Sequence, residues 1–128
     1  MHKLFLDANV LFTAAHNSEG KAAFLFDELH RNHWQLVTSG YAAEEARRNI
    51  AIKYARCTPR LDGLLAQIVT VPQPSSAQEP ILDAARAAAV THLLTDDPKR
   101  FGAHRDHAVQ SAGLIIQRVA DYLTSWAE

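Results

Sequence analysis

A short apolar run that ends in a carboxylate lies at the start of the chain and constrains its fold more than any other feature. Residues 3–6 read Lys-Leu-Phe-Leu, Asp7 follows, and a helical apolar pattern begins with Val10 and Leu11. Parallel strands that are covered by helices on both faces read as continuous apolar runs, and ligands bind outside their carboxyl ends. The pattern therefore predicts a buried strand with Asp7 at its carboxyl edge. A charge in that position must be solvated, paired or bound to a cation.

Strand and helix patterns alternate through the rest of the sequence. Further strands are predicted at residues 35–38, 68–71, 92–95 and 114–116. Helices are predicted over residues 21–33, 41–56 and 58–68, from Pro80 onward and from Val119 onward. This alternation predicts an α/β fold, a three-layer α/β/α sandwich with a central, mostly parallel sheet. At 128 residues the chain has the length of one domain, so we expect a single domain over residues 1–128.

Composition indicates where in the cell the protein is located more clearly than it indicates what the protein does. The formal net charge of −1 neither requires nor excludes a nucleic-acid partner, because a local basic patch can act on a neutral protein. The single cysteine, Cys57, excludes an internal disulfide and fits a reducing compartment. Asp7 interrupts the first apolar run too early for a signal peptide, and no apolar segment approaches the roughly 20 residues of a membrane span. We expect a soluble, cytoplasmic protein that does not enter a membrane.

Acidic side chains follow two of the predicted strands. Asp7 ends the first strand, and Asp96 and Asp97 end the strand at residues 92–95. Glu44 or Glu45, in the first turns of the helix after the second strand, could join them at the same edge. Carboxylates that converge in one cleft repel one another unless they are protonated or neutralised, and Mg²⁺ or Mn²⁺ is the simplest neutraliser. Such a site could activate water and stabilise the charge on a phosphate, which favours phosphodiester hydrolysis.

Three stretches resemble the PIN domain family, in the family's order and at similar separations. They are Leu-Phe-Leu-Asp-Ala-Asn-Val-Leu at residues 4–11, Thr-Ser-Gly-Tyr-Ala-Ala-Glu-Glu-Ala-Arg-Arg-Asn-Ile at 38–50, and the stretch 80–101, which contains Leu-Leu-Thr-Asp-Asp-Pro. PIN domains are metal-dependent ribonucleases, and many short bacterial members are VapC-type toxins of toxin–antitoxin modules. The resemblance implies a Mg²⁺- or Mn²⁺-dependent endoribonuclease with an RNA substrate, an antitoxin partner and a homodimeric assembly.

The resemblance also implies particular site residues. Asp7, Glu45 and Asp97 match the catalytic, metal-binding acids of the family, and Glu44 is the alternative to Glu45. Asp96 stands where the family usually has glycine and could be a fourth metal ligand.

The same comparison points to supporting residues. Asn9 matches the polar residue that supports the first acid, and Thr95 precedes the late acid pair. Gln78 stands where the family commonly has aspartate, and its neutral carbonyl oxygen would hold a metal less firmly. Three acids could compensate: Glu79, Asp83 and Asp96. For Asp83 we favour a structural role, because an acid in the first turn of a helix is stabilised by the helix dipole. A PIN domain that binds RNA or protein without cutting is therefore the alternative function.

Basic and aromatic residues near these acids could contact RNA. The residues expected to carry the RNA backbone are Arg47, Arg48, Lys99 and Arg100, with Lys53, Arg56 and Arg105 close by in the sequence. Lysine and arginine contacts to phosphate supply most non-specific affinity, although a helix with several basic residues is commonly just a solvated face. Trp34 and Tyr41 could stack unpaired bases, but we favour core packing for both.

Other site chemistries fit the sequence less well. His104 and His107 lie one helical turn apart but lack two further ligands for zinc, so a solvated polar loop is favoured. A phospho-acceptor receiver domain should have its acid pair after the first strand and a lysine after the last, where this chain has Gln117. A haloacid-dehalogenase-like phosphatase would need an aspartate at the position of Asn9.

Overall fold

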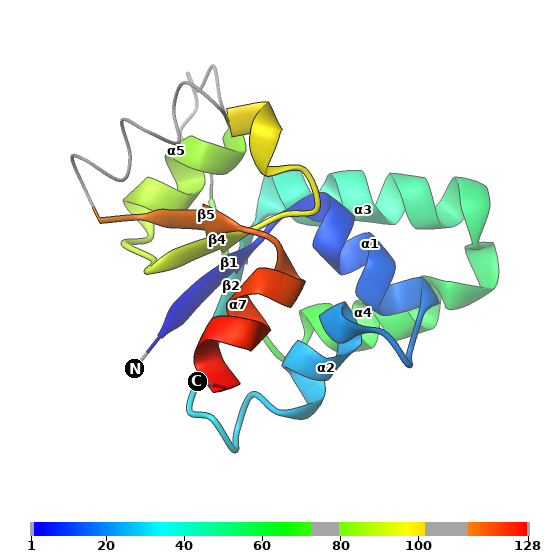
Figure 1. The fold of residues 1–128 in the computed structure, drawn as a ribbon. Helices are drawn as coiled ribbons and strands as arrows, with labels where there is room; N and C mark the ends of the chain where they lie inside the picture. The colour runs from blue at the N-terminus through cyan, green and yellow to red at the C-terminus, as the bar shows by residue number, and fades with distance from the viewer. Residues whose placement is uncertain (1, 73–79, 102–112, 128) are drawn as a thin grey trace.

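The computed structural model describes residues 2–72, 80–101 and 113–127, and these residues form the predicted α/β/α sandwich (Figure 1). The strands are β1 (Lys3–Leu6), β2 (Gln35–Ser39), β3 (Val69–Val71), β4 (His92–Leu94) and β5 (Ile115–Gln117). They form one sheet in the order β3-β2-β1-β4-β5, and every neighbouring pair is parallel. The prediction of a parallel sheet is confirmed.

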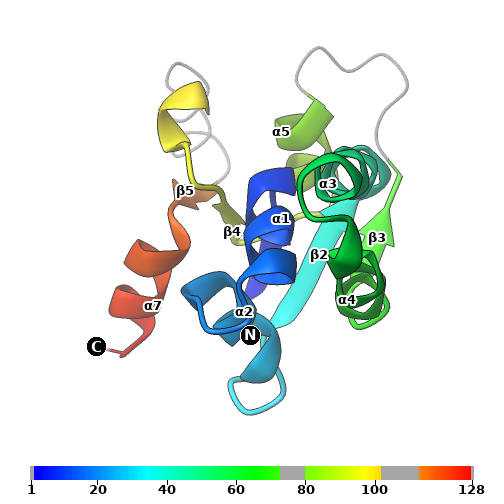
Figure 2. The same ribbon diagram turned by 90° about the vertical axis from the view of Figure 1, so that its right-hand side faces the viewer.

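Helices cover both faces of this sheet. They are α1 (Ala8–His16), α2 (Lys21–Asp27), α3 (Gly40–Lys53), α4 (Thr58–Leu65), α5 (Pro80–Ala87) and α7 (Val119–Ala127), with the short 3-10 helices η1 (Ala55–Cys57) and η2 (Pro98–Phe101). Figures 1 and 2 show α1 to α4 on one face and α5 on the other, and α7 packs near α2. Right-handed crossovers produce this division, because the chain first builds the sheet outward from β1 through β2 to β3 and then returns to the other side of β1.

This reversal places the topological switch point between β1 and β4. Ligands of open α/β sheets bind in the crevice at such a point, outside the carboxyl ends of the strands. Asp7 follows β1, and Thr95 follows β4. The chain therefore brings its first acid and the late Thr-Asp-Asp motif to the same place.

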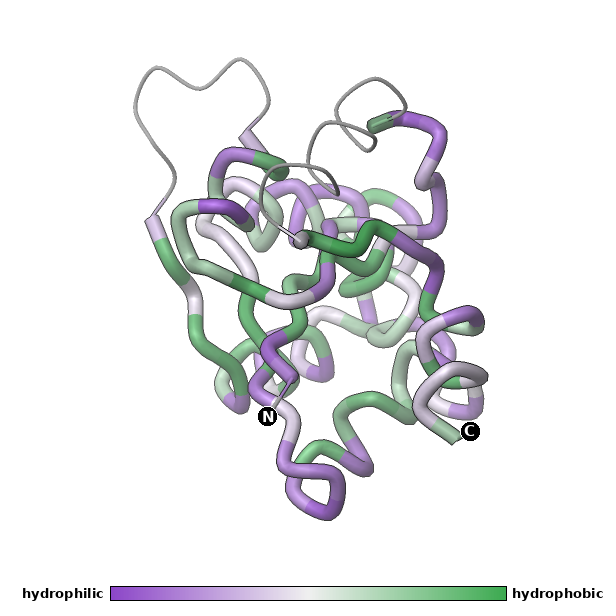
Figure 3. The backbone as a smooth tube through the Cα atoms, turned by 60° about the vertical axis from the view of Figure 1, so that its left-hand side comes forward, coloured by the Kyte–Doolittle hydropathy of each residue, from purple (hydrophilic) through white to green (hydrophobic). Residues whose placement is uncertain are grey.

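The core is built from the central strands and the inner faces of the helices. Leu4, Phe5 and Leu6 of β1 are all fully buried, as expected for the central strand of the sheet. In Figure 3, hydrophobic and hydrophilic segments alternate along the chain, as expected where helices bury one face and expose the other. None of the helices in the described ranges is long and apolar enough to cross a membrane.

Three predicted helices end earlier than expected. Helices α2, α3 and α4 end at Asp27, Lys53 and Leu65 rather than at residues 33, 56 and 68. After α2, Glu28 has a φ of −108° and a ψ of 7°, which depart from helical values, and the chain then makes turns until His33. After α3, Tyr54 has a φ of −144°, so the chain leaves the helix there before it forms η1.

Several residues singled out from the sequence lie outside the described ranges. They are Gln78, Glu79, His104, Arg105 and His107. The supporting role of Gln78 and the zinc alternative at the two histidines therefore remain sequence predictions.

Candidate functional site

Asp7 is the residue on which the site is centred. It leaves β1 with extended backbone angles and caps α1, because its Oδ1 accepts a hydrogen bond from the backbone N–H of Ala8 at 2.7 Å. Aspartate is among the best N-cap residues, so the change from strand to helix at this point is encoded locally. The whole residue is buried, with no exposed surface. The fold therefore holds a carboxylate rigidly at the edge of its core.

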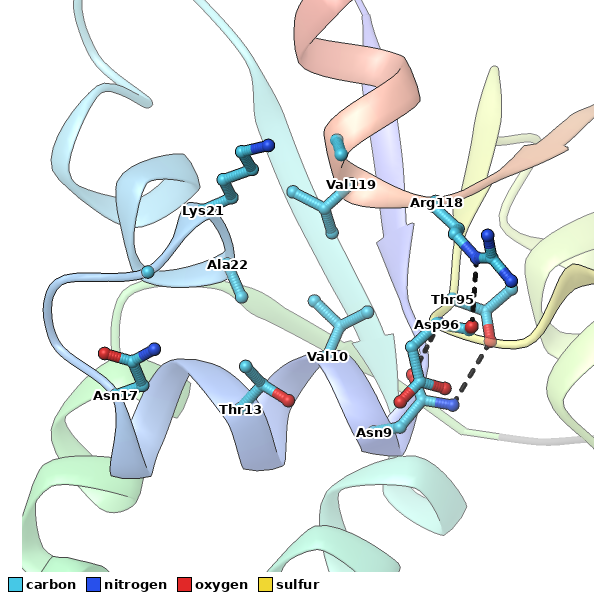
Figure 4. A pocket seen from close by; sticks show the side chains of 12 residues that line it. Asn9, Val10, Thr13, Asn17, Lys21, Ala22, Thr95, Asp96, Arg118 and Val119 are labelled. Atoms are coloured by element: carbon cyan, nitrogen blue, oxygen red, sulfur yellow. Dashed lines mark hydrogen bonds between the residues drawn. The ribbon is translucent and has the colours of Figure 1, made fainter.

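The second carboxylate oxygen of Asp7 accepts hydrogen bonds from three side chains. Thr95 Oγ1 donates at 2.9 Å, Asn9 Nδ2 at 3.4 Å and Arg100 Nη1 at 3.3 Å. Asn9 also donates to Thr95 Oγ1 at 3.2 Å, and its Oδ1 accepts from the backbone N–H of Asp96 at 3.1 Å (Figure 4). Asn9 and Thr95 thus contact Asp7 directly, as the sequence suggested for supporting residues.

The pKa values of two acids at this edge of the sheet are raised. Burial raises the pKa of Asp7, and the nearby Glu45 raises it further, while Arg100, Thr95 and Ala8 act in the opposite direction without reversing the shift. The pKa of Asp96 is raised as well, first by burial and then by the charges of Asp7 and Asp97. A cation at this edge would favour the ionised form of both acids, against burial and against their mutual repulsion.

A cavity of about 250 Å³ opens beside Asp7. Its walls are Asp7, Ala8, Asn9, Phe12, Glu45, Asn49, Lys53 and Arg100. We call it the acidic cavity. Glu45 shares this cavity with Asp7, whereas the neighbouring Glu44 is exposed and lies 3.8 Å from Arg47 in an ion pair. Of the two glutamates considered from the sequence, Glu45 is therefore the one beside Asp7.

The late acid pair stands next to the acidic cavity and is not part of its described lining. Asp96 and Asp97 are both exposed, and the backbone N–H of Asp97 donates to Thr95 Oγ1 at 3.2 Å. Within residues 2–72, 80–101 and 113–127, no three His, Cys, Asp or Glu side chains are grouped closely enough to hold a metal ion. The described structure thus brings Asp7 and Glu45 together, and it does not place Asp97 in the same cavity as the sequence led us to expect.

Arg100 was expected to contact RNA, and in the structure it is paired with Asp7. Its Nη1 lies 3.3 Å from Asp7 Oδ2, and its side chain is 36% exposed. The short helix η2 turns back directly after the Thr-Asp-Asp motif and so brings Arg100 over the end of β1. The sequence showed a basic residue near the acids but gave no signal for this particular pairing.

The remaining candidates for RNA contact differ in their surroundings. Arg47 lies between Glu44 and Asp62, at 3.8 Å and 3.6 Å, so two surface acids already neutralise it. Arg48 and Lys99 are exposed.

Three further predictions concern residues away from the acidic cavity. Trp34 is buried, as expected for core packing, whereas Tyr41 is 37% exposed, so the preference for core packing was wrong there. Tyr41 is the second residue of α3 and lies on the outer side of that helix, which the sequence pattern did not reveal. Asp83 lies in the first turn of α5, and it is not among the described residues that line the acidic cavity.

A second cavity, of about 270 Å³, lies on the other side of Asn9 (Figure 4). It is bordered by α1, the start of α2 and the start of α7, and its walls are mainly apolar. Asn9 belongs to the walls of both cavities. Two of its hydrogen-bonded partners, Thr95 and Asp96, line this second cavity, so a polar partition separates the apolar cavity from the acidic one.

The donor chemistry of the acidic cavity suits a hard divalent cation. Mg²⁺ is commonly held by one or two carboxylates with water completing its shell, and Asp7 and Glu45 supply two carboxylates. A cation beside Asp7 would favour its ionised form, which burial disfavours. Arg100 already contacts Asp7 Oδ2, so a cation on that oxygen would require the guanidinium to move.

The fold and this cavity define a class of protein: a parallel α/β sandwich with a buried carboxylate and a second acid at its topological switch point. Among solved structures, the chain is similar to one in the crystal structure of VapBC2 from Rickettsia felis bound to a DNA fragment from their promoter. The TM-score is 0.64 at 14% sequence identity, over 91% of this chain and 98% of that chain. This likeness confirms the PIN-like fold. No family model matches the sequence, and no curated protein matches it either.

Proposed function

We propose that this protein is a metal-dependent endoribonuclease that acts as the toxin of a toxin–antitoxin module. The observation that supports it best is the acidic cavity, in which a fully buried Asp7 and Glu45 meet at the switch point of a parallel sheet. Catalysis is assigned to Asp7, Glu45 and Asp97. These three residues and Asp96 are the proposed ligands of Mg²⁺ or Mn²⁺. The bound cation would stabilise charge on the phosphate and make a water molecule more acidic.

The chain's other residues have positioning and balancing roles in this proposal. Asn9 and Thr95 hold the Asp7 carboxylate in one orientation through their hydrogen bonds. Arg100 balances the buried charge when no divalent cation is present, and it is free to meet an RNA phosphate once a cation takes over that role. Arg48 and Lys99, with Arg47, are the proposed backbone contacts, and Gln78 is proposed to support the metal ligands.

An antitoxin protein is the proposed partner. The similar solved structure is itself a VapBC complex, which supports a partner of this kind. An antitoxin segment with a basic residue would fit the acidic cavity, because it would supply the positive charge that Asp7 and Glu45 lack. We further propose a homodimer in the cytoplasm, in keeping with the single cysteine. Light scattering of the purified protein, alone and with the product of any small neighbouring gene, tests both assemblies.

The direct test of the proposed function is RNA cleavage by the purified chain. With Mn²⁺ or Mg²⁺ the protein should cut single-stranded or structured RNA, and chelation should stop the reaction. Glu45→Gln should reduce cleavage strongly, whereas Glu44→Gln, which removes the same charge one residue away, should not. Equal loss in both variants would contradict the assignment of Glu45, and full activity in Asp7→Asn would remove Asp7 from the mechanism.

One observation favours the alternative function, a PIN domain that binds RNA or protein without cutting. Arg100 contacts the same Asp7 oxygen that a cation would use, and Gln78 replaces an expected acid in the sequence. The variant Gln78→Asp distinguishes the two functions. A large gain in Mn²⁺ affinity or in cleavage would support the binding function for the natural chain, whereas no change would show that the site is complete without that carboxylate.

A further inference from the structure

Three aromatic rings form a continuous surface beside the acidic cavity. Phe12 and His16 lie four residues apart on α1, so they share one face of that helix, and Tyr54 joins them from the end of α3. The rings of His16 and Tyr54 are stacked, with centroids 4.5 Å apart and 10° between their planes. The Phe12 ring lies 4.8 Å from His16 and 5.7 Å from Tyr54. We call these three residues the aromatic strip.

Tyr54 is the exposed end of the aromatic strip. Its backbone N–H donates to the carbonyl of Ile50 at 2.8 Å, which anchors the residue where the chain leaves the helix. Although the ring stacks on His16, 43% of the residue remains exposed. Single exposed aromatic residues are common on protein surfaces. This one differs because its ring stacks on His16 and lies beside Phe12, which lines the acidic cavity.

The aromatic strip continues into the acidic cavity. Phe12 lines the cavity together with Asp7 and Glu45, and so does Lys53, the residue before Tyr54. The Lys53 ammonium lies 5.7 Å from the centre of the Phe12 ring. A linear ligand that is bound along the aromatic strip would therefore reach the carboxylates of Asp7 and Glu45 at a point where Lys53 is close by.

The chain around Tyr54 carries a local excess of positive charge. Five basic residues and no acidic residue stand between Ala46 and Leu61. They are Arg47, Arg48, Lys53, Arg56 and Arg60. Glu44 and Asp62 neutralise Arg47, but Arg48, Lys53 and Arg56 are exposed. Basic side chains attract a phosphate backbone, and exposed aromatic rings stack unpaired bases.

We infer that Tyr54 stacks an unpaired base of an RNA single strand, and that the aromatic strip guides this strand to Asp7. The inference rests on the proposed function for the identity of the substrate. Bases in a duplex are stacked on one another and present no free face, so the strip selects single-stranded segments. Lys53 contacts the phosphate nearest the cavity, because it directly precedes Tyr54 in the chain and lines the cavity together with the carboxylates.

The test measures RNA binding separately from cleavage. The full chain is titrated, in EDTA, against a twelve-nucleotide single-stranded RNA that contains 2-aminopurine, whose fluorescence is quenched when the base stacks. Tyr54→Ala should lower the affinity about tenfold and remove the quenching. Tyr54→Phe should keep both, since it retains the ring, and Tyr54→Leu should behave like the alanine variant. Phe24→Ala is the matched control, because Phe24 on α2 is 44% exposed and lies away from the strip.

Each outcome bears on the inference in a definite way. Equal affinity and quenching in wild type and Tyr54→Ala, equal binding of a duplex of the same sequence, or no RNA binding at low salt would overturn it. If quenching depends on Tyr54 but the protein does not cleave RNA with Mn²⁺, RNA binding by the aromatic strip would be supported and the proposed nuclease activity would be refuted. If Tyr54→Ala cleaves RNA as well as the wild type does, the proposed nuclease activity would stand and the role of the aromatic strip would be refuted.

Discussion

At one end of strand β1, His2 and His92 are packed among aromatic rings, and at the other end Asp7 is packed among hydrogen-bond donors. His2 Nδ1 is bonded to the hydroxyl of Tyr122 at 2.7 Å, and His92 Nδ1 is bonded to Thr91 Oγ1 at 2.8 Å. Burial, and then the nearby His2, lower the pKa of His92 to about 4, so its imidazole is neutral near pH 7. Each of these two histidines therefore has a hydroxyl group as its hydrogen-bond partner.

The carboxyl end of the sheet is organised in a different way. Asp7 is buried as completely as the core leucines, but the group that balances its charge, Arg100, is a partly exposed side chain from a short helix. Buried polar groups that are hydrogen-bonded within the fold, such as His92 and Tyr122, are typical of a structural role. A buried charge whose counter-ion can be exchanged is available for binding. This difference distinguishes the structural end of the sheet from the proposed site.

The largest effect should come from Asp7→Asn. The amide keeps the cap on α1, because asparagine caps a helix as well as aspartate does, but it loses the charge that a cation needs. Cleavage should fall by about 10³-fold or more, while the thermal midpoint without metal should fall modestly, because an amide nitrogen replaces the oxygen that accepts from Thr95, Asn9 and Arg100. Activity assays and melting curves check the two parts. A variant that is less stable and still active would reverse the comparison between the two ends.

The next effect concerns the pH dependence of stability at the histidine end. His92 has a pKa of about 4 in the folded state, below the 6.5 of an ordinary histidine, so the unfolded chain binds the proton first as the pH falls. The contribution of His92 to the free energy of unfolding is therefore present above pH 6.5 and is lost between about pH 6.5 and pH 4. The loss at pH 5 should be about 2 kcal/mol. Urea titrations of wild type and His92→Phe at pH 7 and pH 5 measure it, and an identical pH response in both proteins would contradict the prediction.

Arg100→Ala tests whether the counter-ion of Asp7, at the carboxyl end of the sheet, can be exchanged for a metal cation. Without the guanidinium, Asp7 loses its ion-pair partner within the described part of the chain, and its oxygen is open to a cation. Mn²⁺ should bind about tenfold more tightly, which is about 1.4 kcal/mol, and the metal-free protein should be less stable at pH 8. Calorimetric titration of Mn²⁺ without RNA checks this, with Lys99→Ala as the control that removes a neighbouring charge. Weaker Mn²⁺ binding in Arg100→Ala would show that the arginine supports the metal site.

The smallest effect should come from Arg47→Ala. Arg47 pairs with Glu44 and Asp62 on the surface, at distances of 3.8 Å and 3.6 Å, and solvent screens both pairs. The free energy of unfolding should change by less than about 0.5 kcal/mol. RNA affinity should fall less than in Arg48→Ala, because the two acids already neutralise Arg47. A larger loss of affinity in Arg47→Ala would show that RNA displaces these acids.

The sequence by itself determined the parallel sheet and the place of its first acid. Apolar runs, caps and turns are local signals, so the run before Asp7 and the Thr-Asp-Asp motif after β4 were sufficient to predict two strand ends at one edge. Helix ends were predicted less well. They depend on the backbone angles of single residues, such as Glu28 after α2, which the side-chain pattern does not specify.

Only the tertiary structure decided which side chains meet. Glu44 and Glu45 are neighbours in the sequence, yet the angle at which α3 packs on α1 puts one beside Asp7 and the other on the surface. Arg100 reaches Asp7 across 93 positions of sequence, and Tyr54 reaches His16 across two helices. Such contacts follow from the relative placement of packed elements. Local periodicity shows which face of a helix is buried, but it does not show which residue will face it.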